Sequence, residues 1–348
     1  MTEHGFRCDA GGQSITDAVV SAAGAIVCAD SLPAAERVIG SLSLCCDTFA
    51  KSIWPDVAWR FSGLTTDGCP LEFTFSSVDN ALRFTVDVAA PEVRNCDRIV
   101  AACDLAGRSG YRRPDSNMLE RWMQMQRCHN LSWGARLGVR ALGSRRAAKF
   151  YVEVPVAAQQ FIQSSIKPPL SESIAVMVGH EPEYGIAEYY FRQQLLSKVQ
   201  MDRLLGALCN EDERATMIAG IEHVCGMPIA SALEWTGFGY SVALQDGQKF
   251  PPRLALFLRS SAIGGACRAS QRLLSCTLAE VRERSFYYEL FSDLPARLLP
   301  DHGVVSISCV RPSVAEMRVG LSGMAVGRLV RSFHGQTKAE EVAQCLAH

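Results

Sequence analysis

The sequence predicts an α+β fold: a ten-stranded antiparallel β-barrel with a polar, solvent-filled lumen, surrounded by a ring of α-helices. Ten short segments alternate apolar and polar residues, the period of a strand with two different faces, and they come in five pairs joined by turn residues. Segments with helical spacing separate the pairs, and repetition of this kind is strong evidence for a fold. An open sheet with its polar face in water fits the same alternation, so that alternative stays open here.

Composition sets the broad class of the protein. The 348 residues are 48% hydrophobic and 20% charged, and no low-complexity linker divides them, which predicts one domain over residues 1–348. The formal net charge of −1 gives no general attraction for nucleic acid or anionic lipid, so we expect neither a nucleic-acid nor a membrane partner. The 14 cysteines include no C-x-x-C pair, and the apolar run 19–29 is too short to span a bilayer. We therefore expect a cytoplasmic protein with reduced thiols. For its assembly we expect either a monomer or a homodimer.

The first pair, residues 70–88, shows the pattern most clearly. In its first strand Phe73 and Phe75 point one way and Glu72 points the other. The second strand places Arg83 on the same polar side as Glu72. One face of the pair is thus wholly apolar, and the other carries a carboxylate and a guanidinium.

The remaining elements follow in chain order. Helical spacing is expected over residues 15–53 (with a second start near Pro33), 91–110, 114–130, 193–226, 229–234, 266–294 and 325–346. The other strand pairs are 133–142 with 149–155, 174–179 with 186–192, 238–244 with 253–259, and 304–310 with 317–321. Residues 57–61 also alternate, ahead of the first pair. In the third pair Tyr189 and Tyr190 fit either face.

The polar faces of the strands collect mostly cationic residues. They carry Arg60, Glu72, Arg83, Arg136, Arg140, Lys149, Tyr151, Arg253, Arg259 and Arg318. If the strands close into a barrel, these side chains line its interior, which is wide enough for a ligand. An interior with many arginines and few acids repels itself when empty, so a polyanion such as diphosphate would supply the missing partners. If the sheet is open, the same residues are ordinary surface cations.

Four motifs on these strands resemble a known family. They are Pro70-Leu71-Glu72-Phe73, Leu82-Arg83-Phe84, Lys149-Phe150-Tyr151 and, more loosely, Arg253-Leu254-Ala255-Leu256-Phe257. Together with the order of elements, they are similar to the aromatic prenyltransferases of the ABBA fold, and most similar to the dimethylallyltryptophan synthase (indole prenyltransferase) branch. The fourth motif departs from the family pattern, with Ala255 in place of a second cation and Phe257 in place of a tyrosine.

The resemblance implies a role for each matching residue. Glu72 would be the catalytic residue that contacts the acceptor and takes its proton. Arg83, Lys149 and Arg253 would bind diphosphate, and Tyr151, Tyr190 and Phe257 would shield an allyl cation. Arg136, Arg140, Arg259 and Arg318 would be further lumen cations. No D-D-x-x-D run is present in the sequence, so we expect no metal requirement, with a prenyl diphosphate as co-substrate.

The implied function is transfer of a dimethylallyl or longer prenyl group from its diphosphate to tryptophan or another indole, in secondary metabolism. Two alternatives remain open: a prenyltransferase that acts on a phenol or a peptide side chain, and a non-catalytic barrel that binds a small anionic ligand. At the residue level, Glu72 has the alternative of pairing with Arg83 across the hairpin. Tyr151 has the alternative of being a sheet residue favoured by β-propensity alone.

Overall fold

The protein folds as a closed barrel, which confirms the predicted fold class. The structure, a computed structural model, describes residues 32–127, 129–142, 145–193, 196–235, 237–245, 253–260, 266–282, 286–291, 303–311, 314–323 and 325–326. The strands are β1 (Leu71–Ser76), β2 (Leu82–Asp87), β3 (Ala135–Leu142), β4 (Arg145–Glu153), β5 (Ile174–Glu181), β6 (Ile186–Arg192), β7 (Gly239–Gln245), β8 (Arg253–Arg259), β9 (Val304–Arg311) and β10 (Val314–Ser322). Each strand pairs antiparallel with its neighbours in the chain, and β10 pairs with β1 to close the barrel. Because closure removes both sheet edges, the open-sheet alternative is wrong.

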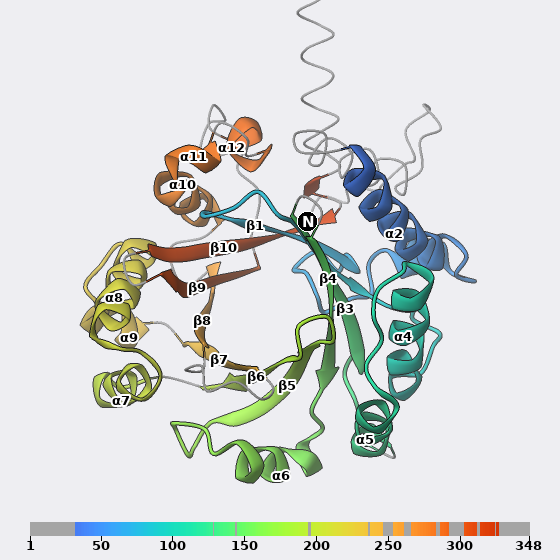
Figure 1. The fold of residues 1–348 in the computed structure, drawn as a ribbon, viewed down its shortest axis with the longest axis horizontal. Helices are drawn as coiled ribbons and strands as arrows, with labels where there is room; N and C mark the ends of the chain where they lie inside the picture. Colours follow the sequence, from blue (N-terminus) through green and yellow to red (C-terminus); the bar gives the residue numbers. More distant parts are fainter. Residues whose placement is uncertain are drawn as a thin grey trace, which may run out of the picture.

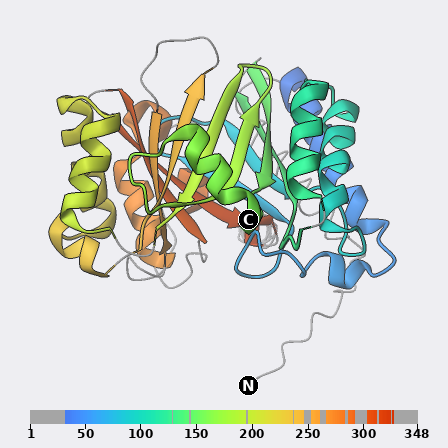
Figure 2. The same ribbon diagram turned by 90° about the horizontal axis from the view of Figure 1, so that it is seen from below.

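Helices form a ring outside the barrel (Figures 1 and 2). They are α2 (Leu32–Ala50), α3 (Pro55–Ala58), the 3₁₀ helix η1 (Asn95–Asp97), α4 (Arg98–Arg108), α5 (Ser116–Gln126), α6 (Val156–Ile166), α7 (Lys198–Leu208), α8 (Glu211–Cys225), α9 (Ile229–Trp235), α10 (Ala266–Cys276), α11 (Ala279–Arg282) and α12 (Phe286–Phe291). Helix α4 covers β3, α6 covers β5, and α8 covers both β9 and β10. Within the described part of the chain, no helix is both long and apolar enough to cross a membrane.

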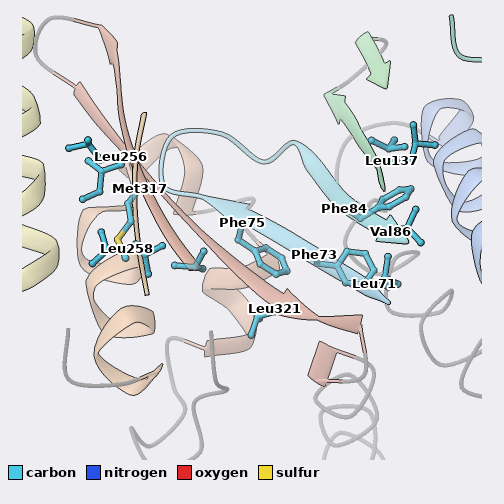
Figure 3. Close-up of a cluster of buried hydrophobic side chains, with 14 of the residues drawn as sticks. Leu71, Phe73, Phe75, Phe84, Val86, Leu137, Leu256, Leu258, Met317 and Leu321 are labelled. Carbon is cyan, nitrogen blue, oxygen red and sulfur yellow. The ribbon is translucent and has the colours of Figure 1, made fainter. Parts of the chain in front are cut away.

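The outer face of the wall carries the hydrophobic core, in the space between barrel and helices. Phe73 and Phe84 face each other across the first hairpin with ring centroids 6.4 Å apart, and Leu137 continues this layer on β3 (Figure 3). Phe75 packs against Tyr287 of α12, with ring centroids 4.9 Å apart. A fully buried side chain of this size contributes about 1.5–3 kcal/mol. Packing of the apolar side chains against the helices therefore turns the polar side chains of each strand toward the lumen.

Several sequence predictions differ from the structure, each for a local reason. Residues 57–61 form no strand, because Pro55 starts the short helix α3 and a turn follows it. The expected helix 193–226 is two helices, since the side chain of Asn210 caps α8 in a capping box. Helix α6 was not predicted at all, and none of its residues is buried. The expected helical residues 15–31 and 327–346 lie outside the described residues.

Candidate active site in the barrel lumen

Strand register places most of the predicted site residues on the inner face of the wall. Side chains alternate along a strand, and directly paired residues on neighbouring strands face the same way. By this rule the lumen-facing members of the predicted set are Glu72, Arg83, Arg136, Arg140, Lys149, Tyr151, Tyr190, Arg253, Phe257, Arg259 and Arg318. Tyr189 therefore faces outward. Arg60 lies in no strand and is exposed, so its expected place on the lumen face is wrong.

The predicted diphosphate ligands do not all lie together. The side chains of Arg83 and Lys149 are 8% and 15% exposed, and each belongs to a different group of charged residues. Arg253, the first residue of β8, is exposed, as is Arg259 at the other end of that strand. The structure thus brings Arg83 and Lys149 inside the lumen and leaves Arg253 near a strand end.

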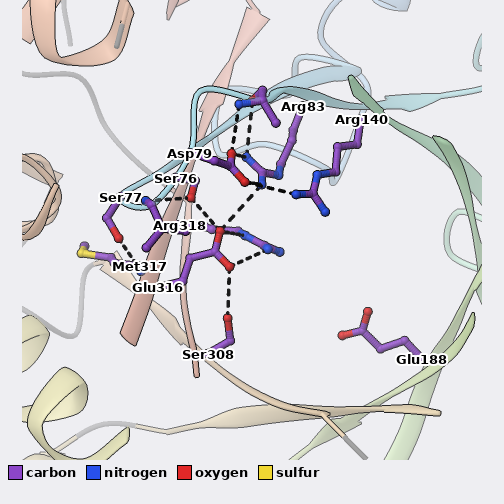
Figure 4. Close-up of polar contacts among 12 residues, drawn as sticks. Ser76, Ser77, Asp79, Arg83, Arg140, Glu188, Ser308, Glu316, Met317 and Arg318 are labelled. Atoms are coloured by element: carbon purple, nitrogen blue, oxygen red, sulfur yellow. Dashed lines mark hydrogen bonds and ion pairs between the residues drawn. The ribbon is translucent and has the colours of Figure 1, made fainter. Parts of the chain in front are cut away.

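One group, which we call the arginine cluster, consists of Asp79, Arg83, Arg140, Glu316 and Arg318 (Figure 4). Arg83 donates both Nη atoms to the carboxylate of Asp79, at 2.7 and 2.6 Å, and its Nη2 lies 3.7 Å from Glu316. Arg140 reaches the same Asp79 at 3.1 Å, and Arg318 binds Glu316 in bidentate fashion at 2.7 and 2.6 Å. Three guanidinium groups against two carboxylates leave an excess of one positive charge.

The pKa values in the arginine cluster keep its carboxylates ionised. Burial alone would raise the pKa of Asp79, but the hydrogen bonds and charge of Arg83 outweigh it and lower that pKa to about 2. Burial would also raise the pKa of Glu316, but the charge of Arg318 is the main effect that outweighs it, and that pKa is lowered. The cluster is therefore a set of fixed charges across the neutral pH range.

The second group, the lysine cluster, consists of Lys149, Glu181 and Glu188. The Nζ of Lys149 is hydrogen-bonded to Glu188 and lies 3.2 Å from Glu181. Ser241 donates a hydrogen bond to the other oxygen of Glu188. Burial would lower the pKa of Lys149, but the charge of Glu188 outweighs it and raises that pKa. One ammonium against two carboxylates leaves an excess of one negative charge.

Three aromatic rings lie beside the lysine cluster. The Tyr151 and Tyr190 ring centroids are 6.0 Å apart, and those of Tyr190 and Phe257 are 5.6 Å apart. The Nζ of Lys149 is 5.7 Å from the Tyr151 centroid and 5.8 Å from that of Tyr190. We call these rings the aromatic trio; the structure brings together the three residues predicted as a cation shield. Burial raises the pKa of both tyrosines, so their phenol groups stay neutral.

Glu72 stands apart from both clusters. Its register partners are Thr85 and Ser322, while Arg83 makes its ion pairs with Asp79 and Glu316. The alternative that Glu72 merely pairs with Arg83 is therefore wrong. Burial raises the pKa of Glu72 to about 7, and the charge of Arg136 limits the rise. A carboxyl group with a pKa near neutrality can both accept and release a proton at physiological pH.

The acids of the lumen are the residues that sequence reasoning missed. The expectation of a self-repelling interior is wrong, because Asp79, Glu188 and Glu316 pair with its cations, and Asp87 binds Arg136 at 3.0 Å. Alternation places Asp87 on the polar face with Arg83, and it was a usable signal for Glu188 and Glu316 too, which are in phase with lumen positions on their strands. Asp79 lies in the connection between β1 and β2, where alternation gives no direction.

Comparison with known proteins places the fold among solved structures. No family model matches the chain, and no curated protein matches it in sequence. The complex of 5-dimethylallyl tryptophan synthase from Streptomyces coelicolor with DMASPP and Trp aligns with a TM-score of 0.72 at 14% identity, covering 90% of this chain and 96% of that one. Prenyltransferase PriB in its apo form aligns with a TM-score of 0.70 at 11% sequence identity, covering 90% of this chain and 97% of PriB. The complex of 6-dimethylallyltryptophan synthase from Micromonospora olivasterospora with DMASPP and Trp aligns with a TM-score of 0.68 at 13% sequence identity, covering 90% of this chain and 99% of that one. The chain thus has the ABBA fold, the barrel fold of these proteins.

Proposed function

We propose that the protein is an aromatic prenyltransferase that moves a dimethylallyl or longer prenyl group from its diphosphate to an indole, tryptophan being the first candidate. One observation carries the proposal: a single lumen holds the positively charged arginine cluster, the aromatic trio and a carboxyl group of pKa about 7. The shared fold supports it, since two of the similar structures are complexes with DMASPP and Trp.

In this proposal the arginine cluster binds the diphosphate. Guanidinium groups form bidentate hydrogen bonds with phosphate oxygens, and the cluster has one positive charge more than its own carboxylates neutralise. When the allylic C–O bond breaks, its electron pair leaves with the diphosphate, and fixed cations stabilise the charge that develops there. The guanidinium charges do the work that a divalent cation does elsewhere, so we propose that transfer needs no metal ion.

The aromatic trio would then face the allyl cation. Ring faces stabilise a nearby cation by about 0.5–2 kcal/mol and keep water away from it. The negative excess of the lysine cluster acts in the same direction. Lys149 can donate to the diphosphate only by giving up its bond to Glu188. Arg253 remains a proposed ligand that would act from the exposed start of β8.

Glu72 would complete the reaction as the general base. Its carboxylate accepts a hydrogen bond from the acceptor N–H, which makes the ring more electron-rich. The ring carbon then forms the new C–C bond with the allyl cation, and Glu72 takes up the proton that the acceptor loses. A pKa of about 7 suits this transfer, because a base works best when its pKa is near the working pH.

The test is incubation of the full chain with dimethylallyl diphosphate and a panel of acceptors, with and without EDTA, followed by mass spectrometry. The panel contains tryptophan, other indoles, phenols and peptides with aromatic side chains. We expect an acceptor-dependent gain of one dimethylallyl unit, largest for an indole and retained in EDTA. Tight binding of pyrophosphate without product from any acceptor would overturn the proposal and favour an anion-binding barrel. Product with phenols or peptides alone would reassign the acceptor.

A further inference from the structure

Three glycines on the inner face of the wall lack a backbone reason to be glycine. They are Gly138 on β3, Gly179 on β5 and Gly320 on β10, in phase with lumen-facing residues. None of them has a positive φ, so an L-residue fits the backbone at each. Glycine in the middle of a strand lowers stability, and it often marks a place where another group approaches closely. The question is which group approaches each glycine.

Two of the glycines face the lysine cluster and the aromatic trio. A Cβ atom added at Gly138 would lie 2.8 Å from Cε2 of Tyr151. A Cβ atom added at Gly179 would lie 2.6 Å from Cε of Lys149 and 3.2 Å from Cε2 of Tyr190. The ends of these side chains therefore lie flat against the wall, in recesses that exist only because a side chain is missing there.

The third glycine, Gly320, forms a recess for Glu72. A Cβ atom added at Gly320 would lie 2.5 Å from Cδ and 3.1 Å from Cγ of Glu72. Glu72 is on β1, and its carboxyl group lies across the neighbouring strand β10 at this point. The recess holds the carboxyl group against the wall instead of letting it extend into the lumen.

Glycines elsewhere in the described residues differ in what an added Cβ would meet. Gly239 also lies on the lumen face, but a Cβ there would meet Cβ of Phe257 at an ordinary 3.8 Å and the carbonyl oxygen of Phe191 at 3.2 Å. At Gly206, on helix α7, an added Cβ would meet nothing within 4 Å. Close side-chain contact also occurs outside the lumen, where a Cβ added at Gly107 would lie 2.6 Å from Cζ of Arg113, but at Gly138, Gly179 and Gly320 the side chains concerned are those of the site.

We propose that Gly138, Gly179 and Gly320 are positioning residues, whose missing side chains form the recesses that hold Tyr151, Lys149 with Tyr190, and Glu72. This proposal rests on the proposed function for its consequence, namely that the space kept free in the lumen is filled by the prenyl diphosphate and the acceptor. An added methyl group would push flexible side-chain ends off the wall, and the strand backbone can stay in place. Gly→Ala variants should therefore impair the site without unfolding the barrel.

The experiment compares Gly138→Ala, Gly179→Ala and Gly320→Ala with the control Gly206→Ala. We expect all four to unfold at nearly the wild-type urea concentration. Gly320→Ala should reduce prenyl transfer 10-fold or more with unchanged affinity for inorganic pyrophosphate. It should also move the pKa of Glu72 toward the ordinary glutamate range, measured by NMR on ¹³C-labelled glutamate. Gly138→Ala and Gly179→Ala should lower transfer and leave the pKa of Glu72 at its wild-type value.

A double-mutant cycle keeps the proposal testable if Gly320→Ala is unstable. If the added methyl group clashes with Glu72, then Gly320→Ala in a Glu72→Ala background should cost less stability than in the wild type. If Gly320→Ala is unstable and costs the same stability in both backgrounds, or if it is stable with wild-type transfer and a wild-type Glu72 pKa, the proposal is overturned. If the wild type transfers no prenyl group, the proposed function fails, and the Glu72 pKa in Gly320→Ala still decides the positioning role.

Discussion

The arginine cluster and the lysine cluster occupy different sides of one lumen and carry opposite net charges. The arginine cluster, on β2, β3, β10 and the connection after β1, has three guanidinium groups for two carboxylates. The lysine cluster, on β4, β5 and β6, has one ammonium for two carboxylates, and aromatic rings lie next to it. Figure 4 shows Glu188 of the lysine cluster well separated from the arginine cluster. The lumen is therefore polarised, which suits an allylic diphosphate that separates into an anion and a cation.

The two clusters also differ in the chemistry of their cations. Arg83 and Arg318 present planar groups with several donors, of which their carboxylate partners use only some. Lys149 is a compact charge that Glu188 and Glu181 already surround. A diphosphate can add to the first cluster, whereas at the second it must displace a carboxylate. Substitutions in each cluster therefore distinguish the two kinds of cation by their effect on pyrophosphate binding.

The largest effect is expected from a residue outside both clusters. Replacement Glu72→Gln removes the base and keeps the shape, so turnover should fall about 10²–10⁴-fold. Pyrophosphate affinity should not change, because Glu72 contacts neither charged cluster. Steady-state kinetics and calorimetry measure the two effects, with exposed Glu120→Gln as the control. Unchanged turnover would remove Glu72 from the mechanism.

Pyrophosphate affinity should separate the arginine cluster from the lysine cluster. Loss of one charge-assisted hydrogen bond costs about 1.5–3 kcal/mol, so Arg83→Gln should weaken pyrophosphate binding roughly 10–100-fold. Lys149→Gln should weaken it by less than about 10-fold, since that ammonium is already neutralised. Arg318→Gln repeats the test at a side chain that is 35% exposed, where truncation disturbs the fold less. If Lys149→Gln has the larger effect, the assignment of the diphosphate to the arginine cluster is wrong.

Removing the negative charge of a lumen acid should strengthen pyrophosphate binding. Glu188→Gln makes the lysine cluster neutral and frees Lys149, so pyrophosphate should bind more tightly, by about 3–10-fold. Glu181→Gln should have a smaller effect, because Glu181 is the more distant partner of Lys149 at 3.2 Å. Calorimetric titration at constant ionic strength measures both variants. Weaker binding to Glu188→Gln would show that this carboxylate positions Lys149 for the ligand.

The smallest effect concerns stability and pH. The pKa of Glu72 is about 7 in the folded protein, above the value near 4.3 of an unfolded chain, so between these values the folded state binds more protons. Its contribution therefore destabilises the fold progressively as pH rises from about 4.3 to 7. Glu72→Gln should remove this slope in urea unfolding at pH 5 and pH 8. The contribution of Asp79 to stability has the opposite pH dependence, because its pKa is lowered in the folded protein. This contribution is present at neutral pH and is lost only in acid.

Alternation with a period of two predicted the barrel wall and the direction of its side chains. This worked because the core outside the wall selects the apolar face of every strand, as Phe73 and Phe84 show. The charge pairing was not predictable in the same way, because it depends on register. Arg83 meets Glu316 only because β10 closes on β1, which places residues more than 200 positions apart side by side. Helix α6 escaped prediction although Ile162 and Ile166 lie on one of its faces and pack partly buried against the core, because that face is short and none of its residues is fully buried.

The closing ladder between β1 and β10 has a consequence for how the protein matures. Among the ladders of the described strands, this one alone joins distant parts of the chain, and every other ladder is a contact between successive strands. Ladders between successive strands, whether these are joined by a turn or by helices, can form as synthesis proceeds. The β1–β10 ladder must wait for the last strand. Glu316, with Ser76 and Arg83 as partners, and the Gly320 recess for Glu72 span that ladder. A nascent chain therefore completes its lumen, with the arginine cluster that we propose as the diphosphate site, only when β10 has paired with β1.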